Sequence, residues 1–307
     1  MKIKYEDHNF KKSSLAQIAI ANQIIELYLP KNLILTLRQL FYQFVIRNVI
    51  ENSEKAYTNL GNLMVNARMA GMSDWDALED RIRIPRLPTE FDSPQDLIDA
   101  AINSFRLPRW KEQDWYVELW CEKDALSNIL ASMARKYHIT LMVNRGFGSA
   151  SSLHETADRF IAQEEAEHKA ILYLGDFDPS GEDMVRDLRK RLSVFGADLT
   201  IEKIALTFDQ VKQYNLVPNP VKKSDSRARA FIEKYGESSW EVDALPPDVL
   251  HKLVEEAILK VLDMDKYNKV IEQEDADKEL LEEMKDKFNI DNPDDDDADS
   301  GADTDDQ

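Results

Sequence analysis

Two aspartates, Asp176 and Asp178, lie at alternate positions directly after a short apolar run at residues 171–175. The run is typical of a buried strand, and side chains two residues apart on an extended segment point the same way. Both carboxylates are therefore expected at the carboxyl end of the strand, where ligands bind in open α/β sheets. Two like charges this close favour a divalent cation between them. The alternative is that the aspartates only cap the next helix and shape the turn.

A third carboxylate is expected at the same place. Glu122 follows a second apolar run, and strands alternate with helices from residue 115 to residue 206, which predicts a parallel sheet covered on both faces. The predicted strands are 115–121, 139–144, 170–174 and 200–206. Because crossover connections are right-handed, the carboxyl ends of the strands share one edge, where Glu122 can meet Asp176 and Asp178. Three carboxylates favour Mg²⁺ or Mn²⁺.

Two arginines and a tyrosine have the chemistry to act on a phosphate. Arg145 begins the turn after the second strand and is expected at the same edge, in contact with a phosphate. Arg38 and Tyr42 are four residues apart on a predicted helix at 37–50, so they lie together on one side of it. Arg38 could hold a phosphate and favour the phenolate of Tyr42 as a nucleophile. The alternative is that Tyr42 is a half-buried packing residue.

The segment that carries Arg38 and Tyr42 is predicted to be helical. Helices are expected at 13–29, 37–50 and 54–72, followed by a short basic segment at 74–86. Several short helices with a basic exit are typical of a helix-turn-helix or winged-helix unit, although an ordinary small helical domain gives the same pattern. Residues 87–113 contain three prolines and one predicted helix, which indicates a connection between domains.

Two motifs resemble a known family. Glu122-Lys123-Asp124-Ala125 after a strand, together with GDFDPSG at residues 175–181, resembles a toprim domain, as found in topoisomerases, bacterial primases and several nucleases. With the upstream TLRQLFY motif, whose last residue is Tyr42, the chain resembles the A subunit of topoisomerase VI and the related meiotic double-strand-break transesterase. It is shorter than typical A subunits and resembles more closely the compact single-chain relatives found in prokaryotic and viral genomes.

The resemblance implies an α/β protein with a winged-helix-like domain at 1–110, a toprim domain at 111–262 and a charged helix with an acidic tail at 263–307. Tyr42 would attack a DNA phosphate beside Arg38. Glu122, Asp176 and Asp178 would hold Mg²⁺, or Mn²⁺, and Lys123 would add positive charge. In this family the tyrosine and the metal site come from opposite protomers, so the resemblance also implies a homodimer that makes paired nicks in DNA.

Two other functions remain open. In hydrolytic toprim nucleases, which process plasmid or phage DNA, the same carboxylates activate water, and Tyr42 would be structural. A non-catalytic DNA-binding subunit is the second alternative. The chain has no GxxxxGK[ST] motif, so a complete topoisomerase reaction would require a separate ATPase subunit.

Two segments after the predicted sheet carry further candidates. A basic cluster, expected either to contact phosphate or to be a solvated loop, comprises Lys222, Lys223, Arg227 and Arg229. A segment similar to the Glu-x-x-Ala-Leu stretch of topoisomerase VI A subunits contains Glu241 and Asp243. By that similarity, one of these two carboxylates is expected to support the metal ligands.

The net charge of −19 is concentrated at one end of the chain. Residues 241–307 contain 24 of the 58 acidic residues but only 7 of the 39 basic ones, so the remainder is nearly neutral and DNA binding is not excluded. Residues 291–307 are expected to be a disordered acidic tail that either solubilises the chain or mimics nucleic acid. The single cysteine, Cys121, excludes an internal disulfide. With no signal peptide and no membrane-spanning stretch, the sequence predicts a cytoplasmic protein.

Overall fold

The computed structural model describes residues 2–31, 33–79, 88–144, 146, 148–222 and 224–288. The chain divides into two compact units. One consists of residues 1–84 and 110–264, and the other of residues 85–109 and 265–307.

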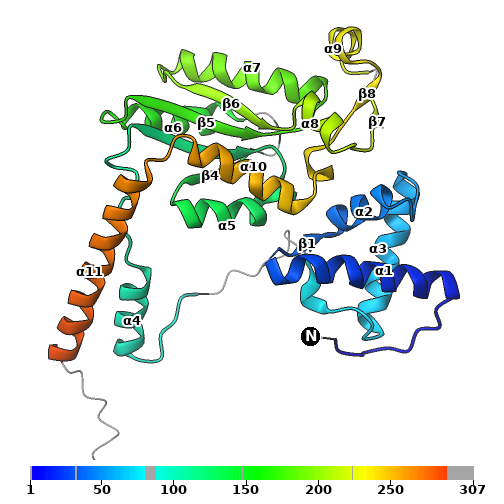
Figure 1. Cartoon of the computed structure of the whole chain (residues 1–307), viewed down its shortest axis with the longest axis horizontal. Helices are drawn as coiled ribbons and strands as arrows, with labels where there is room; N and C mark the ends of the chain where they lie inside the picture. Colours follow the sequence, from blue (N-terminus) through cyan, green and yellow to red (C-terminus); the bar gives the residue numbers. More distant parts are fainter. Residues whose placement is uncertain are drawn as a thin grey trace, which may run out of the picture. The chain divides into compact units, whose positions relative to one another are not determined.

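A four-stranded parallel sheet lies in the first unit, as the sequence predicts (Figure 1). Its strands are β3 (Trp115–Cys121), β4 (Thr140–Val143), β5 (His168–Leu174) and β6 (Thr200–Ala205), in the order β4-β3-β5-β6. Cys121 at the end of β3 pairs with Val143 of β4 and with Leu174 of β5. Three strands therefore end at the same level, and the residues that follow them share one edge of the sheet.

Helices cover both faces of this sheet. On one face α6 (Ala150–Ile161) packs beside α7 (Pro179–Val194), and on the other α5 (Ser127–Tyr137) packs beside α10 (Pro247–Leu259). Ile171 and Tyr173 of β5 belong to a buried cluster with α6 and α7. Leu172 and Leu174 are also fully buried, and strand alternation directs them to the opposite face. Burial on both faces explains the continuous apolar run of β5.

The N-terminal part of the first unit is helical. Its helices are α1 (Lys12–Tyr28), α2 (Leu37–Ile46) and α3 (Glu54–Met69). Thr36 and Gln39 form a capping box that begins α2. The helix ends four residues before the predicted end at residue 50, and Asn48 after it has a φ of 55°. The winged-helix assignment remains a prediction, and residues 80–86 of the predicted basic segment lie outside the described residues.

The segment between β6 and α10 returns the chain to the carboxyl edge of the sheet. It contains α8 (Phe208–Gln213), α9 (Ala228–Tyr235), an antiparallel pair of β7 (Asn219–Pro220) with β8 (Ser238–Ser239), and a 3-10 turn, η4 (Val242–Ala244). Phe177 and Trp240 exchange two backbone hydrogen bonds, which fix this segment beside the loop after β5.

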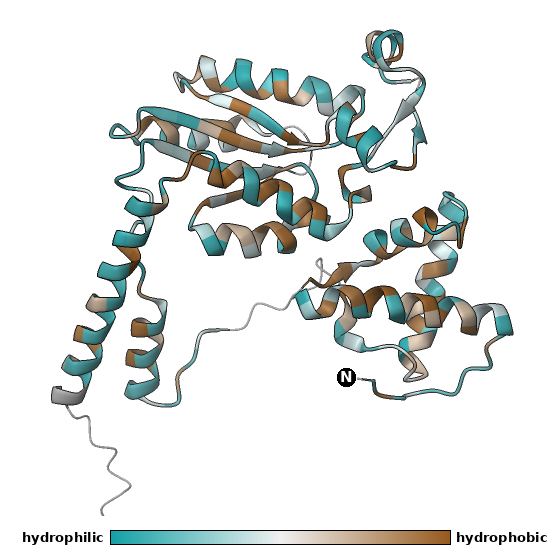
Figure 2. Ribbon diagram, in the orientation of Figure 1, coloured by the Kyte–Doolittle hydropathy of each residue, from teal (hydrophilic) through white to brown (hydrophobic). Residues whose placement is uncertain are grey.

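The second unit pairs α4 (Pro94–Ser104) with α11 (Met264–Phe288). Glu274 of α11 is only 1% exposed and accepts hydrogen bonds from the Leu107 backbone N–H and from the side chains of Arg109 and Lys278. Hydrophilic residues dominate α11, whereas hydrophobic residues recur along α10 (Figure 2). The predicted acidic tail, residues 291–307, lies outside the described residues. Within the described part of the chain, no helix has the length and apolar character needed to cross a membrane.

Candidate functional site

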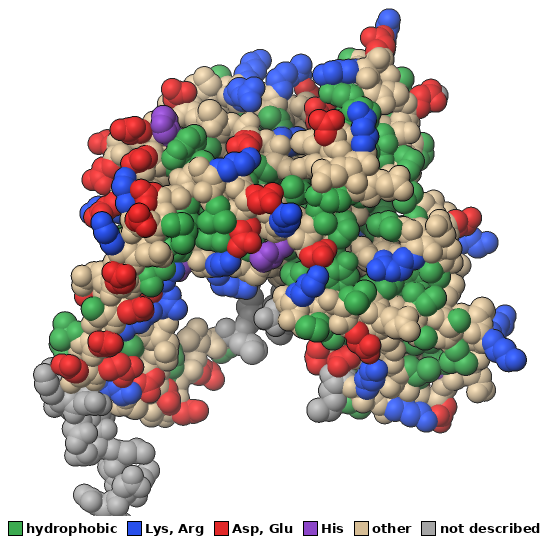
Figure 3. Space-filling model, in the orientation of Figure 1, with side chains coloured by type: hydrophobic (Ala, Val, Ile, Leu, Met, Phe, Trp, Pro, Cys, Tyr) green, Lys and Arg blue, Asp and Glu red, His purple; other side chains and the backbone are tan. Residues whose placement is uncertain are grey.

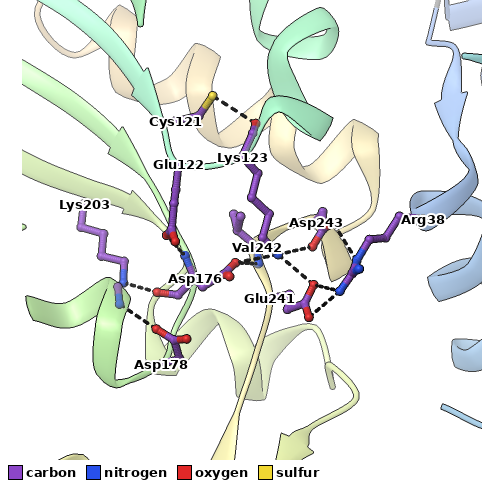
Figure 4. Close-up of polar contacts among 11 residues, drawn as sticks. Arg38, Cys121, Glu122, Lys123, Asp176, Asp178, Lys203, Glu241, Val242 and Asp243 are labelled. Carbon is purple, nitrogen blue, oxygen red and sulfur yellow. Dashed lines mark hydrogen bonds and ion pairs between the residues drawn. The ribbon is translucent and has the colours of Figure 1, made fainter. Parts of the chain in front are cut away.

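An open pocket of about 400 Å³ lies at the carboxyl edge of the sheet. The segments after β3 and β5, the start of η4 and helix α2 all contribute side chains to it (Figure 4). It is lined by Arg38, Glu122, Lys123, Asp124, Ala125, Asp176, Glu241 and Asp243. Five of these side chains are carboxylates and two are cations, so the pocket is an acidic environment.

Glu122 directly follows β3 and points toward the loop after β5. Its carboxylate accepts a hydrogen bond from the Asp176 backbone N–H at 3.2 Å. A Cβ on Gly175 would lie 3.0 Å from this carboxylate and 2.7 Å from a ring carbon of Tyr173, so glycine leaves the space that Glu122 occupies. Burial raises the pKa of Glu122, and the nearby charge of Asp178 raises it further.

Asp176 is the central carboxylate of the site. One of its oxygens accepts a hydrogen bond from the Val242 N–H at 2.8 Å and lies 3.1 Å from the Lys123 ammonium. The residue is only 9% exposed. Burial raises its pKa to about 7, with Glu122 and Asp243 adding to the rise and Lys123 opposing it. Asp176 therefore changes its charge near neutral pH when no metal is bound.

Asp178 has a different local role. It is the N-cap of α7, and its carboxylate accepts a hydrogen bond of 2.6 Å from the Gly181 N–H. A Cβ on Gly181 would lie 2.2 Å from the Asp176 carbonyl oxygen, so only glycine fits this tight turn. Asp178 therefore caps a helix, as the alternative interpretation of the two aspartates expected. The charge of Asp178 still raises the pKa of Glu122. Phe177 between the two aspartates is buried against Trp240 and other aromatic rings.

Lys123 supplies the positive charge at the centre of the cluster. Its ammonium lies 2.8 Å from Glu241, 2.9 Å from Asp243 and 3.1 Å from Asp176. Burial acts to lower the pKa of Lys123, but these three carboxylates raise it above its ordinary value. Among the described residues, no group of three or more His, Cys, Asp or Glu side chains has an arrangement that could hold a metal ion. Asp176 instead pairs with Lys123, and Asp178 caps α7.

Arg38, on α2, contacts the carboxylates Glu241 and Asp243 of this cluster. The sequence did not predict this contact. Its guanidinium donates to both carboxylate oxygens of Glu241, one of them at 2.6 Å, and its Nε lies 3.4 Å from Asp243. Although burial acts to lower the pKa of Arg38, Asp243 and Glu241 raise it above its ordinary value. From the resemblance, either Glu241 or Asp243 was expected to support the metal ligands, but no sequence signal pointed to the pairing of both with Arg38.

Lys203 makes a second contact that the sequence did not predict, between the loop after β5 and helix α7. This β6 residue donates to the Asp176 carbonyl oxygen at 2.8 Å and to Glu182 at 2.7 Å. It thereby holds the Asp176 backbone against the first turn of α7. A lysine within a predicted strand gives no sign of such a role, because strand alternation alone directs it to solvent as readily as to a neighbouring loop.

Tyr42 lies one turn after Arg38 but does not line the pocket. Its side chain is buried, with only 3% of the residue exposed, and the Arg38 guanidinium lies 5.9 Å from its ring centre. Burial raises the pKa of Tyr42 to about 12, and Asp243 and Glu241 act in the same direction. Arg38 and Lys123 oppose this rise only in part. In this conformation Tyr42 is a buried packing residue, as the alternative interpretation of this tyrosine expected.

The other basic residues expected to contact phosphate, Arg145 and the cluster at 222–229, do not line the larger pocket or lie outside the described residues. Arg145 and Lys223 lie outside the described residues. Lys222 lines a second pocket of about 150 Å³, which also includes Asp176, Asp178 and Glu241. Arg227 pairs with Asp225 at 2.8 Å. On the face shown in Figure 3, acidic and basic side chains are interspersed.

No protein-family model matches this chain, and no curated protein matches its sequence. The geometry of the pocket and the two sequence motifs therefore carry the functional argument.

Proposed function

We propose that this chain is a metal-dependent enzyme that cleaves DNA, related to the topoisomerase VI A subunit. One observation carries the proposal. Glu122, Asp176 and Asp178 lie close together at the carboxyl edge of a parallel sheet, and Arg38 and Lys123 line the same pocket as Glu122 and Asp176. Carboxylates provide Mg²⁺ with its preferred ligands, whereas an arginine and a lysine bind phosphate.

The carboxylates fit a divalent cation chemically, but among the described residues they are not arranged to hold one and would have to rearrange to bind it. Glu122, Asp176 and Asp178 would hold Mg²⁺ or Mn²⁺. When bound, the ion would supply positive charge to the reacting phosphate and its leaving oxygen. The raised pKa values of Glu122 and Asp176 express the cost of keeping negative charge here without a cation. Asp176 would have to exchange its contact with Lys123 for the ion.

The remaining residues would bind the substrate and carry out the attack. Arg38 and Lys123 would hold the scissile phosphate. The Tyr42 oxygen would form a bond to phosphorus as the bond to the 3′ oxygen breaks, leaving a 5′-phosphotyrosyl link and a free 3′-hydroxyl. The Tyr42 proton would pass to a base or to water, and the leaving 3′ oxygen would take up a proton from water. Helix α2 would have to expose the buried ring first. We further propose a winged-helix-like role for the N-terminal helices, action as a homodimer, and a separate ATPase subunit if strands are passed.

A hydrolytic toprim nuclease is the second candidate, and one specific observation favours it. Tyr42 is buried, lies outside the pocket lining and has a pKa of about 12, all of which suit a packing role. In that reaction the carboxylate site would activate water, and no protein–DNA bond would form.

Cleavage of supercoiled plasmid separates these reactions. Wild type, Tyr42→Phe and Asp176→Ala are incubated with Mg²⁺ or Mn²⁺, quenched with SDS and run with and without protease. Tyr5→Phe and Asp209→Ala are matched controls, since both residues are exposed.

Broken DNA whose mobility depends on protease, lost in Tyr42→Phe and Asp176→Ala but kept in the controls, supports transesterification. Breakage that survives Tyr42→Phe but not Asp176→Ala supports hydrolysis. No breakage in any sample, with or without added partner proteins, contradicts the enzymatic proposal and leaves a non-catalytic DNA-binding subunit.

A further inference from the structure

The guanidinium of Arg38 is already engaged by a carboxylate. Both oxygens of Glu241 accept hydrogen bonds from Arg38, and one of them also accepts a 2.8 Å hydrogen bond from Lys123 (Figure 4). Both hydrogen bonds come from Nη2 of Arg38, and a guanidinium uses the same N–H groups for the oxygens of a carboxylate and of a phosphate. Glu241 therefore occupies the position at which Arg38 and Lys123 would receive a phosphate.

Glu241 and Asp243 hold these cations in different ways. The Asp243 side chain is completely buried and contacts both Lys123 and Arg38, so it is a fixed part of the structure. The Glu241 side chain is 24% exposed. Glu241 also lines both the larger pocket and the adjacent pocket of about 150 Å³. It can thus leave Arg38 by rotating its side chain toward neighbouring open space, while Asp243 keeps Arg38 and Lys123 in place.

The exchange of Glu241 for a phosphate conserves charge. Burial acts to raise the pKa of Glu241, but Lys123 and Arg38 lower it to about 2, so the side chain is an anion throughout the neutral range. A phosphodiester group carries the same single negative charge. The competitor that releases Glu241 is therefore another anion, and a change of pH within the neutral range does not release it.

We propose that Glu241 is an internal anion that occupies the phosphate position of Arg38 in the resting protein and is displaced when a DNA phosphate binds. The DNA part of this proposal rests on the proposed function. The contact is autoinhibitory, because part of the affinity of Arg38 for phosphate is used to displace Glu241. A protein without the Glu241 charge binds phosphate more tightly, by a factor equal to the reciprocal of the fraction of time that the wild-type site is unblocked.

The test is the affinity for a short fluorescent DNA duplex, measured by anisotropy in EDTA so that binding is observed without cleavage. Glu241→Gln is expected to lower the Kd by about fivefold to tenfold. Glu233→Gln removes the same charge from an exposed helix position and is the control for general electrostatics. The gain from Glu241→Gln is expected to be smaller when Arg38→Gln is also present, because Glu241 then blocks only the Lys123 part of the phosphate position.

Three results would overturn the proposal: a Glu241→Gln effect equal to that of Glu233→Gln, a gain that is undiminished with Arg38→Gln, or weaker binding by a folded Glu241→Gln protein. The last result would make Glu241 a positioning residue for Arg38. Should Glu241→Gln fail to fold, Glu241→Asp keeps the charge but shortens the reach to Arg38, and it is expected to bind DNA more tightly than wild type. Unchanged or weaker binding by Glu241→Asp would then overturn the proposal.

A second measurement separates this proposal from the proposed function. Inorganic phosphate is titrated into wild type, Glu241→Gln and Glu233→Gln, and thermal stabilisation is recorded. Glu241→Gln is expected to be stabilised at about fivefold lower phosphate concentration than the other two proteins. If no protein binds DNA but this difference is present, the DNA assignment fails and the internal anion stands. Equal stabilisation of all three proteins would overturn the internal anion.

Discussion

Replacing Asp176 by asparagine is expected to stabilise the metal-free protein at alkaline pH. The pKa of Asp176 is about 7 in the folded chain, against an ordinary value of 3.8. A carboxyl group whose pKa is raised by folding contributes most to stability below its unfolded pKa, and this contribution is lost as the pH rises through its folded pKa. For Asp176 the window therefore runs from about pH 4 to about pH 7.

The magnitude follows from the same shift. Each pKa unit corresponds to about 1.4 kcal/mol, so between pH 5 and pH 8 the wild type should lose about 3 kcal/mol through this one group relative to Asp176→Asn. The asparagine oxygen can still accept the hydrogen bond from the Val242 N–H, and Lys123 keeps Glu241 and Asp243 as partners. The substitution thus removes the buried charge and leaves these contacts in place.

The assay is urea unfolding in EDTA at several pH values, followed by tryptophan fluorescence. The quantity of interest is the difference in unfolding free energy between Asp176→Asn and wild type, because the carboxylates distant from Asp176 contribute equally to both proteins. Asp209→Asn, at an exposed position, is expected to show no such trend. A difference that stays constant from pH 5 to pH 8 would refute the reasoning.

Adding Mg²⁺ extends the same experiment. A divalent cation bound by ionised Asp176 stabilises only the folded protein, so wild type should gain stability at pH 8, where the carboxylate is charged, and gain less at pH 5. Asp176→Asn should gain little at either pH. Equal stabilisation of both proteins would place the ion elsewhere.

Three further predictions test the framework around the site. Gly181→Ala is expected to lower the unfolding free energy by at least about 2 kcal/mol, because the added Cβ would lie 2.2 Å from the Asp176 carbonyl oxygen; a chain with unchanged urea midpoint would contradict this close approach. Glu118→Ala removes a fully buried carboxylate of β3 that accepts hydrogen bonds from Tyr116, Trp120 and Arg159. Because these donors lose their acceptor, the unfolding free energy should fall by about 2–3 kcal/mol in the same assay, whereas a loss below about 1 kcal/mol would show that the carboxylate is dispensable. Tyr42, which is 3% exposed, should resist nitration by tetranitromethane under conditions that modify Tyr5, which is 62% exposed, as read by peptide mass spectrometry; equal modification would show that Tyr42 is accessible.

The sheet was predictable because its signals are local. Two apolar runs, the one before Asp176 and the one at 115–121, are too short and too apolar to be surface helices. They fit strands of a parallel sheet, because such strands are buried on both faces. The observed β3 has the predicted bounds, and the other three strands differ by one or two residues at their ends. The convergence of Glu122 and Asp176 followed from parallel connectivity alone.

The contacts that decide the chemistry of the pocket were not predictable in the same way. The pairing of Arg38 with Glu241 joins residues 203 positions apart, and no periodicity or motif specifies it. Alternation along an extended segment suggested that Asp176 and Asp178 act alike, but the turn at Gly181 directs Asp178 to the start of α7. Sequence identifies which groups reach an edge, whereas their pairing depends on packing between distant segments.

Lys123 would connect the proposed metal site and the proposed phosphate site of the pocket through one side chain. It binds Asp176 on one side and Glu241 with Asp243 on the other. A cation that takes Asp176 would leave Lys123 with one carboxylate fewer, so its charge would be more available to an incoming phosphate. The coupling must be reciprocal, because a ligand that raises the affinity for a second ligand is itself bound more tightly in return. Mg²⁺ should therefore tighten DNA binding by the same factor by which DNA tightens Mg²⁺ binding. Replacing Lys123 by methionine should remove most of that factor, because the shared cation is then absent from both sides of the exchange.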